Sequence, residues 1–215
     1  MQSMATRNEA LRAHAGRAPV VPVVTIEDAG RAVALAETLV AAGLPVVEVT
    51  LRTPAALAAM AAIARAVPEA VVAAGTVTSA DDVRAVAEAG AAFIVTPGTS
   101  PRLAEALAAG PLPAMPGCAT ASEAMALAEH GFEVLKFFPA QASGGAAWLK
   151  GVGGPLRRLA FCPTGGIDAG NAKTYLALPN VLCVGGSWMV PPAAIASGDF
   201  ATFGRLAREA AALRG

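Results

Sequence analysis

The chain has 215 residues, and its 16 Lys and Arg residues balance its 16 Asp and Glu residues, so the formal net charge is zero. This balance gives no electrostatic reason to expect nucleic acid or an anionic membrane as a partner. Hydrophobic residues make up 55% of the chain, but every apolar run is shorter than the ~18 to 20 residues that a spanning helix needs. We therefore expect a single domain over residues 1–215, with no membrane partner.

Residues 1–18 are rich in Arg and Ala and superficially resemble a transit peptide. The stretch lacks an apolar h-region, and we predict a short helix that precedes the first strand. The three cysteines, Cys118, Cys162 and Cys183, are odd in number, are not spaced as a metal clip, and lie in or beside apolar segments. We therefore predict buried, reduced thiols and a cytoplasmic location.

Short β-branched runs then alternate with Ala- and Leu-rich helical segments, which is typical of parallel strands linked by crossover helices. We count eight such units. Most of the strands are apolar on both faces, as buried parallel strands are. The predicted strands are residues 20–25, 46–51, 71–74, 93–96, 112–115, 134–137, 158–162 and 181–184.

The helical segments between the strands carry start and stop signals. Ser79 and Ser122 are predicted N-caps, neither with the Glu or Gln three residues on that would complete a capping box. Glycines are predicted to end four helices in the left-handed conformation, at Gly43, Gly90, Gly110 and Gly131. The predicted helices include residues 29–42, 80–89, 101–109, 122–130 and 169–178.

Eight units favour an α/β fold of the (β/α)₈ barrel type, with the extra N-terminal helix added to it. An open doubly wound sheet also uses such units, but the three spaced glycines of a dinucleotide site do not follow the first strand. In a barrel, the functional face is at the carboxyl ends of the strands. The polar residues predicted there are Glu48, Thr50, Arg52, Thr76, Thr96, Lys136, Thr164 and Ser187.

Lys136 has the most apolar setting of any charged residue in the chain, and it is one of only three lysines. Burial disfavours the ammonium form, leaving a neutral amine that can attack a carbonyl and form an iminium electron sink. Two structural explanations compete with this role. The side chain could reach along the strand to solvent, or it could pair with Glu48 as a core ion pair.

Glu48, Thr50 and Arg52 alternate by two, so all three point to the same side of their strand, and only the barrel lumen suits a carboxylate. Glu48 could move the protons that imine formation, cleavage and hydrolysis require. Its structural alternative is a salt bridge to Arg52 or Lys136. The planar guanidinium of Arg52 is well shaped to bind a substrate carboxylate.

Two glycine pairs, residues 165–166 and 185–186, are predicted to form turns after the seventh and eighth strands. Barrels commonly bind phosphate at those two loops. A metal site has little support, because His14 precedes the first strand and His130 ends a helix, so no histidine cluster is expected. The same scarcity of His argues against hydrolysis by a nucleophile and base pair.

These residues closely resemble the bacterial 2-dehydro-3-deoxy-6-phosphogluconate (KDPG) aldolases, which are also active as 4-hydroxy-2-oxoglutarate (KHG) aldolases. The likeness covers nearly the whole chain. It is carried by VVPV (20–23), VEVTLRT (47–53), AGTV (74–77), TPG (96–98), PG (116–117), KFFPA (136–140), FCPTGGI (161–167) and VGGSW (184–188).

The resemblance implies class I cleavage of a phosphorylated keto-deoxy sugar acid to pyruvate and glyceraldehyde 3-phosphate, in a homotrimer, with no metal or organic cofactor. It makes Lys136 the imine lysine and Glu48 the acid and base. Arg52, Thr76 and Pro97 would contact the pyruvate end, and Phe138 would form a wall beside the imine. The phosphate end would be lined by Thr164, Gly165, Gly166, Gly186 and Ser187.

One position departs from the family pattern, because Gln141 stands where many members carry Glu. This change affects either specificity or the anchoring of the loop. Three other functions stay open: cleavage of the galactonate-derived isomer, a barrel that binds a phosphorylated ligand without turnover, and a sugar-phosphate isomerase that uses Glu48 as base and Lys136 as electrophile.

Overall fold

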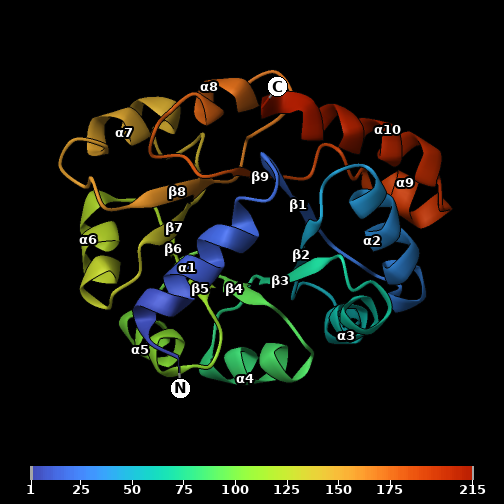
Figure 1. Cartoon of the computed structure of the whole chain (residues 1–215), viewed down its shortest axis with the longest axis horizontal. Coiled ribbons are helices and arrows are strands. Elements are labelled where there is room, and N and C mark those ends of the chain that lie inside the picture. Colours follow the sequence, from blue (N-terminus) through green and yellow to red (C-terminus); the bar gives the residue numbers. More distant parts are fainter. Residues whose placement is uncertain (1, 215) are drawn as a thin grey trace.

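The computed structural model describes residues 2–214 and shows parallel strands enclosed by helices (Figure 1). The predicted (β/α)₈ barrel is confirmed. The strands are β1 (Val20–Val24), β2 (Val46–Thr50), β3 (Val71–Gly75), β4 (Phe93–Val95), β5 (Ala114–Met115), β6 (Gly117–Cys118), β7 (Val134–Phe137), β8 (Ala160–Pro163) and β9 (Val184–Gly186).

Within residues 2–214, nine strands form the eight strand positions of the barrel. Pro116 interrupts the fifth position, which is therefore divided into β5 and β6. One sheet runs in the order β5-β4-β3-β2-β1-β9, and the other in the order β6-β7-β8. Parallel bridges between Phe161 and Val181 and between Thr164 and Gly185 connect β8 to the eighth strand position, which contains β9. The carboxyl ends of all the strands therefore meet at one face.

Most of the helices surround the strands, and α1 lies across them (Figure 1). A short 3₁₀ helix at Ala29–Arg31 leads into α2, and another follows α10. The α-helices are α1 (Met4–Ala15), α2 (Ala32–Ala41), α3 (Ala56–Ala66), α4 (Ala80–Glu88), α5 (Pro101–Ala109), α6 (Ala121–Glu129), α7 (Gly145–Val152), α8 (Ala172–Leu176), α9 (Pro192–Ser197) and α10 (Phe200–Ala211).

Several predicted boundaries were wrong. The eighth strand was predicted at residues 181–184, but β9 begins at Val184 and continues through Gly185 and Gly186. These two glycines are therefore buried inside a strand, not in a turn. Their lack of a side chain is required by packing, since a Cβ on Gly185 would collide with Thr164 and one on Gly186 with Trp188.

The predicted helix ends were partly correct. Gly43, Gly90 and Gly131 have positive φ, as predicted, but Gly110 has φ −72° and ψ 166°. Gly110 precedes Pro111, and the proline ring restricts the preceding residue to extended conformations.

Helix starts also differ from the prediction at two places. Thr120, and not Ser122, caps α6, because Glu123 completes a capping box with it. Ser79 caps α4 as predicted, with Asp82 as the reciprocal partner. Helix α8 begins later than predicted because the Asp168 carboxylate accepts hydrogen bonds from the backbone N–H groups of Gly170 and Asn171.

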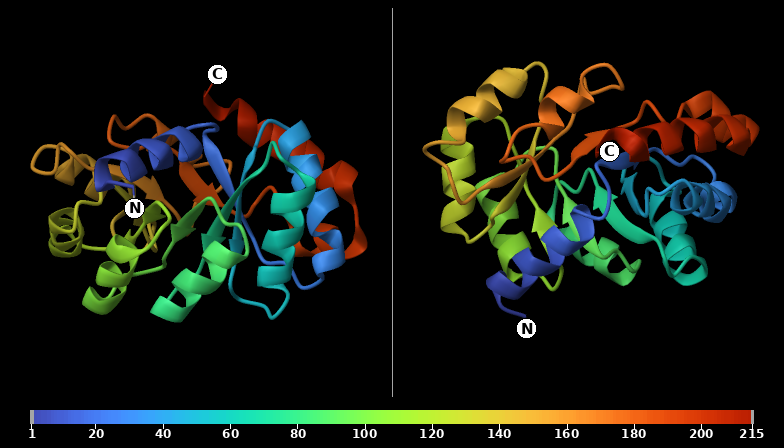
Figure 2. Two further views of the ribbon diagram at one scale, coloured as in Figure 1. Left: turned by 60° about the horizontal axis from the view of Figure 1, so that its bottom comes forward. Right: turned by 45° about the horizontal axis from the view of Figure 1, so that its top comes forward.

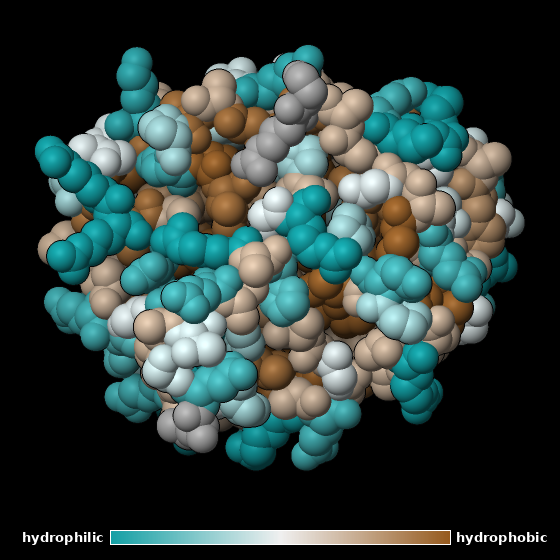
Figure 3. Space-filling view, in the orientation of Figure 1, coloured by the Kyte–Doolittle hydropathy of each residue, from teal (hydrophilic) through white to brown (hydrophobic). Residues whose placement is uncertain are grey.

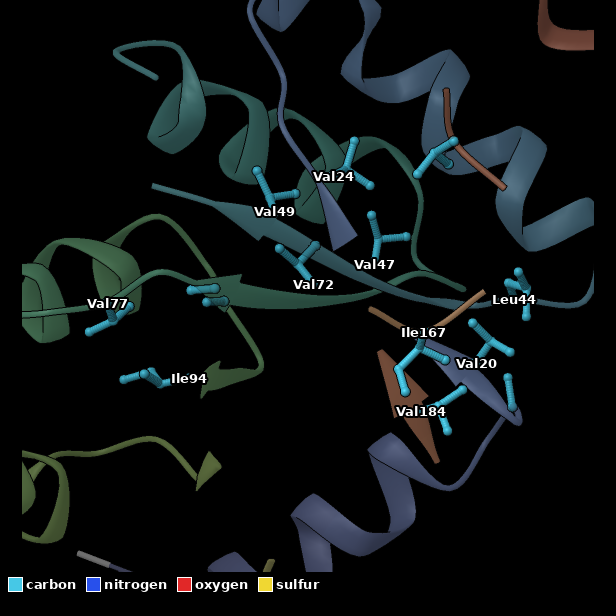
Figure 4. Close-up of a cluster of buried hydrophobic side chains, with 14 of the residues drawn as sticks. Val20, Val24, Leu44, Val47, Val49, Val72, Val77, Ile94, Ile167 and Val184 are labelled. Carbon is cyan, nitrogen blue, oxygen red and sulfur yellow. The ribbon is translucent and has the colours of Figure 1, made fainter. Parts of the chain in front are cut away.

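Side chains alternate between two buried layers along each strand. Val47 and Val49 of β2 pack with Val24 and Val72 in the outer layer, against the helices (Figure 4). Val46, on the same strand, belongs to the inner layer inside the barrel. Because the side-chain period of a strand is two, Glu48 and Thr50 also point into the lumen.

Helix α1 closes the amino-terminal mouth of the barrel and confirms the predicted N-terminal helix (Figure 2). Leu11 and Ala15 are fully buried in the inner layer. The buried Arg7 guanidinium donates hydrogen bonds to the carbonyl groups of Leu107, Ala108 and Gly110. These are the last carbonyls of α5 and its cap, so Arg7 satisfies acceptors that the helix end leaves open.

Hydrophilic and hydrophobic residues are mixed on the face that carries α1 (Figure 3). Across residues 2–214, no helix combines the length and apolar character that would let it cross a bilayer. Cys118, Cys162 and Cys183 are buried and not joined in disulfides, as predicted. Burial, together with the nearby Glu123 carboxylate, raises the pKa of the Cys118 thiol to about 12.

Candidate functional site

A buried ion pair crosses the barrel lumen between β7 and β2. The Lys136 ammonium donates a hydrogen bond to the Glu48 carboxylate, with Nζ and Oε1 separated by 3.0 Å. Lys136 is 5% exposed and Glu48 3% exposed. The sequence left solvent or Glu48 open as the surroundings of the Lys136 amine, and Arg52 or Lys136 open as the partner of Glu48. In the structure, Lys136 and Glu48 pair with each other.

Such a pair contributes little to stability, because removing two charges from water offsets most of their attraction. Lys136 lies one residue before the carboxyl end of β7, on the face where barrels place their chemistry. A carboxylate hydrogen-bonded to an amine can accept its proton and return it later. The arrangement is therefore suited to an amine that changes its protonation state during a reaction.

Phe138 lies beside the amine, with its ring centroid 5.4 Å from Lys136 Nζ. The loop after β8 passes close to this ring. A Cβ on Gly165 would lie 3.2 Å from two ring carbons of Phe138, and Gly165 has φ +95°. Glycine at this position lets the loop approach the Phe138 ring, so that two of the predicted site residues are neighbours.

Thr76 follows β3 and is the one residue other than glycine with positive φ (60°) within residues 2–214. The left-handed region is unfavourable for a β-branched side chain, and such strained residues are enriched at functional sites. Gly75, immediately before it, contacts Glu48: a Cβ built on Gly75 would overlap the glutamate side chain. Gly75 was not among the predicted site residues, and its only signal was a glycine directly after the strand predicted at residues 71–74.

Pro97 lies against β6, the strand next to Lys136. Gly117 pairs in register with Lys136, and a Cβ on Gly117 would lie 2.6 Å from the carbonyl carbon and oxygen of Pro97. The Thr96 hydroxyl accepts a hydrogen bond of 2.8 Å from the Gly117 N–H. These contacts place Pro97 on the Lys136 side of the barrel mouth.

Thr164 and Gly166, two of the residues predicted for the phosphate end, follow β8. Thr164 is buried and bridges to Gly185. Gly166 is exposed with φ +74°, and its carbonyl oxygen accepts a 2.8 Å hydrogen bond from the Asn171 side chain. The loop after β8 thus has an exposed backbone held in a fixed position.

Arg52 and Ser187 line one hollow of about 640 Å³ at the carboxyl ends of β1, β2 and β9. The buried ion pair is not among the residues that line it. Arg52 is exposed, and no salt bridge to it is present in the described part of the chain. The structure therefore brings Arg52, predicted for the pyruvate end, together with Ser187, predicted for the phosphate end, and it pairs Lys136 with Glu48 separately.

Thr25 also lines this hollow and was not predicted as a site residue. Its hydroxyl is 3.1 Å from that of Thr50, which in turn donates to the Val24 carbonyl at 3.0 Å. Thr25 ends the first predicted strand, and a polar residue at a strand end was the signal that could have identified it as a site residue. Asp28 and Arg31, which also line the hollow and pair at 3.5 Å, lie outside every predicted strand.

Gln141 anchors the loop after β7. The Tyr175 hydroxyl donates a 2.7 Å hydrogen bond to the Gln141 side-chain oxygen, and the Gln141 N–H donates to the Gly165 carbonyl at 3.0 Å. Burial raises the pKa of Tyr175, which keeps this donor protonated. Of the two roles considered for Gln141, the structure shows loop anchoring.

The residues described contain no group of three or more His, Cys, Asp or Glu side chains placed to hold a metal ion. What the site offers is a primary amine, a carboxylate, an arginine, and two glycine-containing segments.

Comparison with known proteins identifies relatives over most of the chain. The family model "KDPG and KHG aldolase" matches residues 11–206. The chain is 48% identical over 192 residues to the KHG/KDPG aldolase of Escherichia coli (strain K12), covering 89% of this chain and 90% of that one.

Solved structures give the same result. The KDPG aldolase of Legionella pneumophila, with pyruvate captured at low pH as a covalent carbinolamine, matches with a TM-score of 0.91 and 40% identity, over 94% of this chain and 98% of that one. A native KDPGal structure matches less well, with a TM-score of 0.76 and 28% identity, over 89% of this chain and 95% of that one.

Proposed function

The chain belongs to the KDPG and KHG aldolase family, and we propose that it cleaves 2-dehydro-3-deoxy-6-phosphogluconate to pyruvate and glyceraldehyde 3-phosphate through an imine on Lys136. The observation that carries this proposal is the pairing of the Lys136 amine with the Glu48 carboxylate, 3.0 Å apart in the barrel lumen. KHG is the second proposed substrate, cleaved to pyruvate and glyoxylate by the same steps.

In the proposed reaction, Glu48 takes a proton from the Lys136 ammonium, and the free amine adds to the C2 carbonyl of the substrate. Loss of water from this carbinolamine gives the iminium, which accepts electrons when the C3–C4 bond breaks. A base removes the C4 hydroxyl proton as the aldehyde leaves. Protonation of the enamine at C3 and hydrolysis of the iminium then release pyruvate and restore the amine.

The other site residues keep the roles that the family resemblance implies, as part of this proposal. Arg52, Thr76 and Pro97 bind the pyruvate end, and Phe138 is a wall beside the imine. The position of Phe138, 5.4 Å from Nζ, supports its role. The strained backbone of Thr76 supports a functional reason for that residue. Thr164, Gly165, Gly166, Gly186 and Ser187 are proposed for the phosphate end.

The gluconate-type substrate ranks before the galactonate-type one. The support is the higher identity to KDPG aldolases, at 48% and 40%, than to the KDPGal structure, at 28%. A barrel that binds without turnover and a sugar-phosphate isomerase are the other candidates, and they differ from an aldolase in releasing no pyruvate.

We further propose that the whole chain acts as one domain in the cytoplasm. The single-domain assignment is supported by a family model that spans residues 11–206. The cytoplasmic location is supported by three buried cysteines without disulfides, as expected in a reducing compartment.

Lys136→Ala removes the amine and is expected to abolish both the covalent adduct and pyruvate release. Borohydride reduction in the presence of pyruvate, followed by mass spectrometry of the intact protein and its peptides, measures the adduct. Lys150→Ala, at an exposed position on α7, is the matched control and should be trapped at Lys136 like the wild type. Folded wild-type protein that gives no adduct on Lys136 would refute the aldolase proposal.

Glu48→Gln keeps the size of the side chain but removes its proton acceptor. We expect the adduct on Lys136 to persist while turnover slows by about 10² to 10⁴ fold, the usual contribution of a general acid or base. A lactate dehydrogenase assay for released pyruvate measures turnover and also separates cleavage from isomerisation. Full activity of this variant would show that Glu48 does not move the protons.

Ser187→Ala tests the phosphate end of the site. We expect KM to rise more for KDPG than for unphosphorylated KHG, because only the first substrate carries a phosphate. Ser100→Ala, which affects the exposed N-cap of α5, is the control and should leave both KM values unchanged. Equal increases for the two substrates would count against a phosphate site at Ser187.

A homotrimer is the proposed assembly, as the family resemblance implies. Its support in the structure is Met125 of α6, which is 54% exposed and lines a hollow with Leu156. Sedimentation equilibrium is expected to give three times the 21.3 kDa chain mass. A single-chain mass at micromolar concentration would overturn the trimer without affecting the proposed reaction.

A further inference from the structure

We propose that Gly75 is a positioning residue for the reaction, because the absence of a side chain there creates the space in which the Glu48 carboxylate meets Lys136. The inference rests on the proposed function, since it concerns the acid and base of that reaction. It adds a residue that does not itself exchange protons and that acts through Glu48.

The contact between Gly75 and Glu48 involves most of the glutamate side chain. Strands β2 and β3 are neighbours, with Glu48 opposite Ala73 and Thr50 opposite Gly75. The Glu48 side chain leans over Gly75, because a Cβ on Gly75 would be 2.5 Å from Oε1, 2.8 Å from Cγ and 3.0 Å from Cδ. Real Cβ atoms essentially never approach other atoms closer than 3.0 Å, so an alanine at residue 75 and this Glu48 rotamer exclude each other.

The backbone does not require glycine at this position. Gly75 is not among the glycines with positive φ, and the left-handed residue of this corner is Thr76. The Gly75 carbonyl is paired normally, accepting a 2.8 Å hydrogen bond from the Leu51 N–H. Glycine weakens a strand relative to alanine, and in strands it often marks a close approach. Here the approaching group is the Glu48 side chain.

An alanine at residue 75 is expected to spare the fold and impair the chemistry. The atoms that it would displace belong to one flexible side chain, so Glu48 can rotate away without moving the strands. Rotation takes Oε1 from its position 3.0 Å from Lys136 Nζ. The amine and its surroundings remain, but the carboxylate no longer reaches the protons that it moves.

A double-mutant cycle between Gly75→Ala and Glu48→Gln tests this inference. In the wild-type background, Gly75→Ala is expected to lower kcat for pyruvate release from KDPG by about 10² fold or more, while borohydride still traps pyruvate on Lys136. In the Glu48→Gln background, the same change should lower kcat less than about threefold, because the residue on which it acts is already inactive.

Gly151→Ala on α7 is the matched control, because a Cβ there has no atom within 4 Å, and it should retain wild-type kcat. An unchanged kcat in Gly75→Ala, or an equal loss in both backgrounds, would overturn the inference. If Gly75→Ala lowers the melting temperature, the double variant Gly75→Ala/Glu48→Ala is expected to melt at the same temperature as Glu48→Ala alone, because Glu48→Ala removes the colliding atoms. A melting temperature that stays low would place the defect in the strand itself and also overturn the proposal.

These outcomes are distinct from failure of the proposed function. Wild-type protein that forms no pyruvate adduct would refute the aldolase proposal itself. An active wild type with additive losses in the cycle would refute only the role of Gly75.

Discussion

The buried Lys136–Glu48 pair is the interaction on which the arrangement of the barrel mouth depends. Two opposite charges are held 3.0 Å apart among otherwise apolar strands, and neither could be buried there without the other. The glycines around them, including Gly75 and Gly117, provide space for the acid and for the close approach of Pro97. In the proposed reaction, this arrangement gives the Lys136 amine a proton acceptor, Glu48, within hydrogen-bond distance.

Features that depend on periodicity could be predicted from the sequence. The alternation of strands and helices predicted the barrel, and the residue spacing of two in β2 predicted Glu48 in the lumen. Val46, two residues earlier, belongs to the inner layer, and Glu48 pairs with Lys136. Lys136 stood out because a charge inside an apolar strand is rare. The roles of the other site residues came from the family resemblance, because an exposed arginine or a serine after a strand has many ordinary explanations.

Features that depend on contacts between distant segments could not be predicted. Gly185 and Gly186 were predicted to form a turn, since glycine usually marks one, but they lie inside β9, where Thr164 and Trp188 leave no room for a Cβ. The cap of α6 is a different case, because Thr120 and Glu123 are only three residues apart and their capping box was readable in the sequence, although Ser122 was predicted as the cap. A glycine directly after a predicted strand was only a weak signal for Gly75, because glycine is needed there to fit the Glu48 side chain of the neighbouring strand β2.

Helix α1 limits the routes by which small molecules can enter and leave the barrel. Leu11 and Ala15 fill the amino-terminal mouth of the barrel, so, for the described part of the chain, this end of the lumen is blocked. In the proposed reaction, the substrate, the leaving aldehyde and the water that hydrolyses the iminium would then share one entrance. Such a geometry favours an ordered sequence, in which the aldehyde departs before water reaches the carbon attached to Lys136.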